Sequence, residues 1–268
     1  MTYRLDGIID PFSRFKNAPK VAKHTILCHH PSFFDILTKL EHTKIIKIID
    51  CDKYYKHALI KYKKININIV NAYFGPVPTA HRVFEFFARG SRVFVQFGAC
   101  GSLKNLPLGS IILPIEAKRY ENTSSVFISK KIKAEPDSIL LHTLESALKL
   151  KKYPYYKGLI GSVDSIYGYS KKDIAKFKKD NILALDSETS MFFLAIKWLS
   201  KKYPKLEKPK CASVNYISDI IPLNRKTKWI SDLDSISKLL PYKENCLIIC
   251  MESIFLYSKK TPNFYKHK

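Results

Sequence analysis

The sequence predicts an α/β fold, built as one domain over residues 1–268 around a single mixed β-sheet. Three observations favour it. Short apolar runs rich in β-branched residues and bounded by turn residues recur along the chain, as expected for buried strands. Apolar residues at helical spacing lie between several of these runs, and strands that alternate with helices are typical of α/β proteins. No internal repeat and no long Gly/Ser linker divides the chain, so we expect one domain.

Seven segments are the strongest strand candidates, because each is apolar and ends near residues that favour turns. They are Thr25–Cys28, Ile45–Asp50, Ile67–Tyr73, Arg92–Phe97, Ser110–Ile115, Lys157–Val163 and Cys211–Ile217.

Five segments have the spacing of an apolar helix face. Their apolar residues are Phe33, Ile36, Leu37 and Leu40; Val83, Phe86 and Phe87; Leu140, Leu144, Ala147 and Leu148; Phe192, Phe193, Ile196 and Leu199; and the closing stretch Asn245–Tyr257. Pro204 and Pro209 mark a surface connection between the fourth helix and the strand that follows it.

The composition argues against a membrane or secreted protein. No apolar run approaches the roughly 18 residues of a membrane helix, and the first ten residues lack the layout of a signal peptide. The six cysteines form no CxxC pair, so we expect reduced thiols and no metal site. We therefore expect a cytoplasmic protein. Gln96 is the only glutamine and lysines abound, which suggests a heat-adapted source, although a low-GC genome also favours lysine.

The chain is strongly basic, with 46 Lys+Arg against 23 Asp+Glu and a formal net charge of +23. Lysines gather in clusters such as 149–157, 171–179 and 201–210, several of them interleaved with tyrosine. Such clusters can bind nucleic acid, since phosphates attract lysine and exposed bases stack on aromatic rings. Solvated helix ends and loops explain the same clusters without any polyanion, and both explanations stay open.

Three short segments carry candidate chemistry. Phe97–Leu103 has two glycines directly after an apolar strand, where backbone can approach a ligand at the carboxyl edge of a sheet. Leu185–Ser190 holds Asp186 and Glu188 at the start of a helix, where acidic residues are commonly caps. Tyr216–Asp219 ends a strand with Ser-Asp, which is also a common way to begin a turn.

The order of these segments is more specific than any one of them. Between the first and second lies Ser162-Val163-Asp164-Ser165-Ile166-Tyr167, and Gly75-Pro76-Val77-Pro78 opens an earlier helix. This arrangement resembles the purine nucleoside and uridine phosphorylase superfamily, which also contains adenosylhomocysteine-type nucleosidases. That family has a glycine loop after a strand, then S-x-D-x-F-Y, then V-E-M-E, then a strand ending in V-S-D.

The resemblance implies a nucleoside phosphorylase-like α/β sandwich, a mixed sheet flanked by helices, that cleaves the N-glycosidic bond of a nucleoside. It implies that Glu188 binds the ribose hydroxyls and that Asp219 protonates the departing base. Ile166 and Tyr167 match positions that line the base and sugar pocket, and Ser187 replaces a methionine that packs on ribose. Relatives assemble as trimers or hexamers of dimers, so we expect a homo-oligomer.

Departures from the family pattern fall on the phosphate site. The phosphate loop after the first strand becomes His29-His30-Pro31-Ser32-Phe33, without the family's glycine and arginine. Gln96 replaces a second arginine, and Ala99, beside Gly98, replaces a serine or threonine that donates to phosphate. Lys53 matches an arginine lent by a neighbouring subunit. Four expected donors are therefore missing, and phosphate binding needs convergent charged donors.

Three functional alternatives follow from these departures. The chain hydrolyses nucleosides with water, with His29 or His30 as the base, because imidazole titrates near neutrality. It binds inorganic phosphate as co-substrate through Lys53 and the His pair, with no other cofactor. Or it has lost turnover and binds nucleic acid or a ribonucleoprotein. Ser218-Asp219 favours purines, whereas the region around Lys53 leans toward pyrimidines, so the base stays open.

Overall fold

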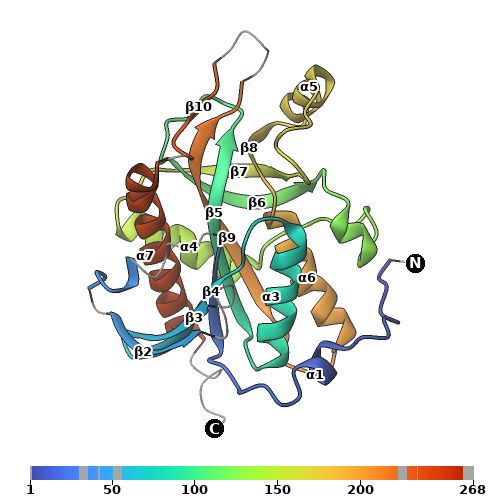
Figure 1. Ribbon diagram of the computed structural model, residues 1–268, viewed down its shortest axis with the longest axis vertical. Coiled ribbons are helices and arrows are strands. Elements are labelled where there is room, and N and C mark those ends of the chain that lie inside the picture. The colour runs from blue at the N-terminus through green and yellow to red at the C-terminus, as the bar shows by residue number, and fades with distance from the viewer. Residues whose placement is uncertain are drawn as a thin grey trace.

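The computed structural model describes residues 2–29, 36–41, 43–50, 56–222, 228–233 and 235–261. Its centre is a ten-stranded mixed sheet (Figure 1). The strands are β1 (His24–Cys28), β2 (Thr43–Asp50), β3 (Lys56–Tyr62), β4 (Ile65–Asn71), β5 (Val93–Ser102), β6 (Ile111–Arg119), β7 (Tyr155–Ser162), β8 (Ile182–Asp186), β9 (Lys210–Ile220) and β10 (Ile230–Ser231).

The strand order is β10-β9-β6-β7-β8-β5-β1-β4-β3-β2, and β9 also pairs with β5. Strands β9, β6, β7, β8 and β5 therefore form a closed ring of paired strands. Strands β1, β4, β3 and β2 extend from β5 as an open wing of the sheet. Strand β5 pairs in parallel with β1 and β9 and antiparallel with β8. The carboxyl ends of β5, β8 and β9 meet as a result.

Helices cover both faces of the sheet. They are α1 (Pro11–Arg14), α3 (Pro76–Ala88), α4 (Ser138–Leu150), α5 (Lys171–Lys179), α6 (Thr189–Lys202) and α7 (Ile236–Lys260), with the 3-10 turn η1 (Thr123–Val126). Helices α3 and α6 pack together on one face, and α4 and α7 pack together on the other (Figure 1).

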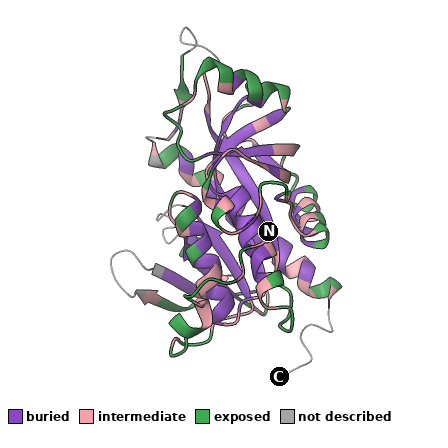
Figure 2. Cartoon of the chain, turned by 90° about the vertical axis from the view of Figure 1, so that its right-hand side faces the viewer, coloured by how far each residue is buried: buried purple, intermediate pink, exposed green. Residues whose placement is uncertain are grey.

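Each face has its own apolar core, because central strands such as β1, β5 and β9 are buried on both sides (Figure 2). The core under α4 and α7 contains Leu144 and Leu247, and the core under α3 and α6 contains Phe86 and Phe192. A smaller cluster under α5 joins Ile174 and Phe177 to β8. The predicted α/β sandwich is confirmed.

Some elements differ from the sequence-based predictions. All seven predicted strands form, but β3 and α5 were missed because their lysines mask the apolar pattern; α5 buries only Ile174 and Phe177. Helix α7 begins nine residues before Asn245 and continues through Pro241, a residue that normally interrupts helices. The predicted glycine loop after β5 is wrong as a loop, because β5 runs on to Ser102 while pairing with β9.

Phe33 of the first predicted helix lies outside the described residues, whereas Ile36, Leu37 and Leu40 are buried. The five described cysteines are free thiols, as expected, and Cys51 lies outside the described part of the chain. Across the described ranges, no helix combines the length and the apolar character that crossing a membrane requires.

Candidate active site

The three chemistry-bearing segments meet at the carboxyl edge of the sheet. Gly101 on β5 is opposite Leu185 on β8 and opposite Asp219 on β9. The register of β5 on β9 shifts between Cys100 and Gly101, so the edge is locally irregular. Backbone pairing thus brings together parts of the chain more than a hundred residues apart.

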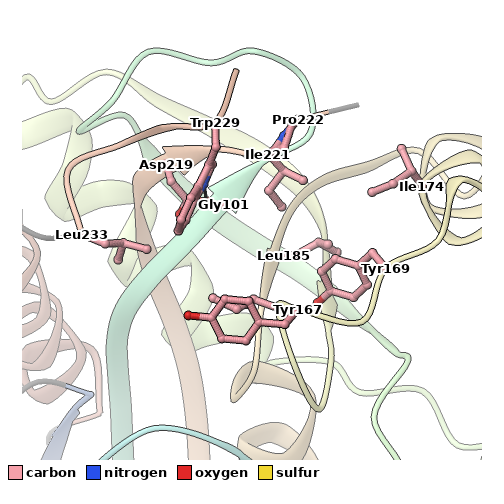
Figure 3. Close-up of a pocket in the computed structure, with 11 residues that line it drawn as sticks. Gly101, Tyr167, Tyr169, Ile174, Leu185, Asp219, Ile221, Pro222, Trp229 and Leu233 are labelled. Carbon is pink, nitrogen blue, oxygen red and sulfur yellow. Dashed lines mark hydrogen bonds between the residues drawn. The ribbon is translucent and has the colours of Figure 1, made fainter. Parts of the chain in front are cut away.

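A pocket of about 350 Å³ opens at this edge (Figure 3). Its size lies in the range of small-molecule sites. The lining is apolar and aromatic, with one carboxylate: Gly101, Ile166, Tyr167, Tyr169, Ile174, Leu185, Asp219, Ile221, Pro222, Trp229 and Leu233. Such a lining favours a flat, largely apolar ring that makes few polar contacts.

Asp219 is the polar centre of this pocket. Its Oδ1 accepts a hydrogen bond from Ser218 Oγ at 2.7 Å, and its Oδ2 accepts one from Trp229 Nε1 at 3.0 Å. A Cβ at position 101 would lie 2.9 Å from Asp219 Oδ2, so only glycine lets the carboxylate approach β5 this closely. Oδ2 keeps a second lone pair, so a ligand N–H can donate to it beside the Trp229 contact.

Asp186 and Glu188 have different roles at the start of α6. Asp186 accepts the backbone N–H of Thr189 at 3.0 Å and the hydroxyl of Ser162 at 2.6 Å, so it caps the helix as expected. Glu188 makes no cap bond to α6. Its Oε1 accepts from Gly75 N at 2.7 Å and its Oε2 from Ser187 N at 3.1 Å. Each Glu188 oxygen keeps a lone pair for a further donor.

His29 and Gln96, at the positions expected to face water or phosphate, belong to a hydrogen-bonded network. His29 Nδ1 contacts the Tyr73 carbonyl oxygen at 2.6 Å, and Nε2 contacts Gln96 Oε1 at 3.2 Å. Gln96 Nε2 donates to Thr189 Oγ1 and Ser213 Oγ, at 2.9 and 3.2 Å. The His29 ring also packs against Gly98, 3.3 Å from where a Cβ would stand.

This network does not suit the expected role of His29 as a base. Both of its ring nitrogens face oxygens that only accept hydrogen bonds, so each contact takes an N–H of the ring and leaves no lone pair directed at water. Gln96 is buried and its amide is likewise occupied. Ala99 brings no polar side-chain group. His30 and Lys53 lie outside the described residues.

The site is acidic although the protein is basic. The carboxylates of Asp186, Asp219 and Glu188 all act on the Cys100 thiol, whose pKa is raised first by burial and then by their charges. Burial, followed by the neighbouring charge of Glu188, also raises the pKa of Asp186. The pocket lining contains no lysine, arginine or histidine among the described residues.

The structure brings most of the predicted site residues to one edge. Asp219, Ile166 and Tyr167 line the pocket, whereas Glu188, Ser187 and Gln96 are not part of its lining. Tyr169 and Trp229 were missed by sequence reasoning. The signal for Trp229 was its rarity as one of two tryptophans, ten residues after Asp219.

Comparison with known proteins identifies the family. A model described as the phosphorylase superfamily matches residues 25–196, more than half of the chain. The chain belongs to this superfamily. The resemblance carried by the four motifs is thereby confirmed, and it favours an enzyme over a nucleic-acid-binding protein.

Three relatives illustrate the range of the superfamily. The purine nucleoside phosphorylase of Plasmodium vivax (strain Salvador I) is 24% identical over 248 residues, covering 84% of this chain and 96% of the relative. The structure of Toxoplasma gondii purine nucleoside phosphorylase in complex with immucillin-H has a TM-score of 0.75 at 16% identity, covering 90% and 93% of the two chains. An AMP nucleosidase from Bacteroides thetaiotaomicron has a TM-score of 0.70 at 16% identity, covering 90% and 91%. The fold alone therefore does not fix the reaction of this superfamily member.

Proposed function

We propose that this protein cleaves the N-glycosidic bond of a nucleoside. The observation that carries the proposal is that Asp219, inside an aromatic pocket, and the buried Glu188 are close enough for both charges to act on Cys100. Both carboxylates stand at motif positions of the superfamily, one for the base and one for the sugar. Incubation with nucleosides and chromatographic detection of the free base tests the proposal directly.

Asp219 assists the departure of the base. A nucleobase anion is a poor leaving group, so a proton or hydrogen bond supplied to the ring as the C–N bond breaks lowers the barrier. The Ser218 hydroxyl, 2.7 Å from Oδ1, can act as donor or acceptor and therefore suits either protonation state of the carboxyl.

Glu188 holds the ribose. Two backbone N–H groups orient its carboxylate, and ribose hydroxyls donate to the lone pairs that remain. Negative charge beside the sugar also stabilises the oxocarbenium-like state that forms as the bond breaks. The backbone contacts keep Glu188 in place before substrate arrives, which lowers the cost of organising the site.

Water is the acceptor that the described residues favour. Three carboxylates act together at the site and disfavour a phosphate dianion, and the pocket lining offers no described cation to offset them. The product distinguishes the acceptors: hydrolysis in H₂¹⁸O places the label in free ribose, whereas phosphorolysis forms ribose 1-phosphate. Base release that requires inorganic phosphate would contradict hydrolysis and leave bond cleavage standing.

Phosphorolysis is the second candidate, and Lys243 favours it. This lysine of α7 is fully buried, and its charge acts on the Cys28 thiol at the carboxyl end of β1. Burial lowers the pKa of Lys243. If phosphate is the co-substrate, Lys243→Met should raise the KM for phosphate at least tenfold. If water is the acceptor, Lys243→Met should leave the rate of base release per folded molecule unchanged.

We also propose self-association through the open wing of the sheet. Strand β2 is the terminal strand, and Ile46 and Ile48 on it are 47% and 50% exposed. An edge strand with exposed isoleucines pairs readily with a second copy. Sedimentation of wild-type protein and of Ile46→Lys tests this, since the variant should shift toward the monomer.

A further inference from the structure

The hydroxyl of Tyr169 is buried and has no hydrogen-bond partner among the described residues. Buried polar groups in proteins nearly always have partners, so each exception calls for an explanation. Tyr169 lines the pocket that contains Asp219. An unsatisfied hydroxyl in the wall of a ligand pocket suggests a ligand group that completes it.

Tyr120 provides an internal comparison. The rings of Tyr120 and Tyr169 both pack against Phe177, with centroids 4.6 and 5.5 Å away. The Tyr120 hydroxyl donates to Asp180 Oδ2 at 2.6 Å, outside the pocket lined by Asp219. Two tyrosines that share a packing partner therefore differ in whether their hydroxyl has a partner in the protein.

Packing fixes where the Tyr169 hydroxyl stands. The edge-to-face contact with Phe177 holds the ring, and its hydroxyl end points toward Tyr167 and Leu185, inward from α5 (Figure 3). Tyr167 is 87% exposed, so few contacts oppose a shift of its ring that would open the hydroxyl to a ligand. Asp219 and Trp229 lie on the other side of the drawn lining.

The hydroxyl chemistry limits what can bind. A phenol both donates and accepts, so it can pair with a carbonyl oxygen or with an amine. Burial raises the pKa of Tyr169, which keeps the proton on the oxygen. A ligand without a polar group at this point would leave the hydroxyl unsatisfied and bind more weakly.

We propose that Tyr169 is a specificity-determining residue whose hydroxyl binds the exocyclic oxygen or amine of the substrate base. This inference rests on the proposed function for the identity of the ligand. It predicts selection for a base with a polar exocyclic group and little selection between an oxo and an amino group.

Calorimetric binding of free bases tests the inference without requiring turnover. The probes are hypoxanthine, adenine and unsubstituted purine, which lacks the exocyclic group. The wild-type protein should bind hypoxanthine and adenine about tenfold to a hundredfold more tightly than purine. In Tyr169→Phe the three affinities should agree within about threefold, and the melting temperature should not fall, since no protein hydrogen bond is lost.

Tyr120→Phe is the matched control. It removes the bond to Asp180 beside the same Phe177, so it should lower the melting temperature and leave the base preference as in wild type. An unchanged preference in Tyr169→Phe would overturn the inference, as would failure of wild-type protein to bind any of the three bases. Selective binding without base release from nucleosides would instead refute the proposed function and uphold the role of Tyr169.

Discussion

Replacing Glu188 by glutamine tests whether this residue binds ribose or only links the beginnings of α3 and α6. The substitution keeps the shape of the side chain and one oxygen that can accept from Gly75 N, which lies 2.7 Å from Oε1 in the wild-type protein. The other end becomes an amide NH₂ facing Ser187 N, which is a donor against a donor. The variant therefore loses one backbone contact and the negative charge in one step.

The two losses have different magnitudes. A partly buried N–H left without its charged partner costs at most about 1–3 kcal/mol of stability, which lowers the melting temperature of a chain this size by at most about 2–10 °C. Loss of one preorganised electrostatic contact to the transition state costs about 10²–10³-fold in rate. We therefore expect Glu188→Gln to reduce kcat/KM by that factor while the protein remains folded.

Steady-state assays of base release and thermal melts measure both effects. Glu252→Gln is the matched control, because Glu252 is equally buried and accepts from Tyr62 Oη and Lys63 Nζ, both at 2.6 Å, outside the pocket lining. It should lose stability and keep kcat/KM within about threefold. If Glu188→Gln also keeps kcat/KM within threefold at the same loss of stability, Glu188 only ties α6 to α3 and the ribose assignment is refuted.

Three further predictions concern other parts of the molecule. Gly101→Ala should lower kcat at least tenfold and stability by about 1–3 kcal/mol, because the new Cβ would lie 2.9 Å from Asp219 Oδ2; a wild-type kcat would contradict this. Burial lowers the pKa of His57 from 6.5 to about 4, so the unfolded chain binds a proton that the folded chain does not, and the stability present above pH 6.5 is lost as the pH falls toward 4. His57→Phe should flatten this decline by at most about 3 kcal/mol in urea titrations at pH 7 and pH 4.5; an identical decline would exclude His57 as its source. Trp198→Phe leaves Trp229 as the sole tryptophan, and its emission should shift when a base binds beside its indole in the pocket; an unchanged spectrum at saturating base would show that the base does not bind there.

The local sequence pattern predicted those strands and helices in which buried positions are occupied mainly by apolar residues. Strands buried on both faces, such as β1 and β9, are rich in apolar residues, and α4 has its apolar residues on one face. Strand β3 and helix α5 were missed because lysines interrupt the apolar pattern of their sequences. Pro241 concealed the beginning of α7.

The site was predictable only in part. Motif order located Asp219 and Glu188, but only the structure separates the cap Asp186 from Glu188, since both stand in the same acidic segment. The engagement of both His29 nitrogens depends on Tyr73 and Gln96, which lie 44 and 67 residues away in sequence. Contacts of this kind arise from strand register, which no local pattern encodes.

Release of free base from nucleosides by wild-type protein and by Asp219→Asn tests the central claim most directly. The assay uses inosine, adenosine and uridine, without and with inorganic phosphate, at room temperature and at elevated temperature. We expect release by wild-type protein without phosphate, and a loss of about 10²–10⁴-fold in Asp219→Asn that leaves the melting curve cooperative. Absence of release from every nucleoside, or equal release by the variant, would contradict it.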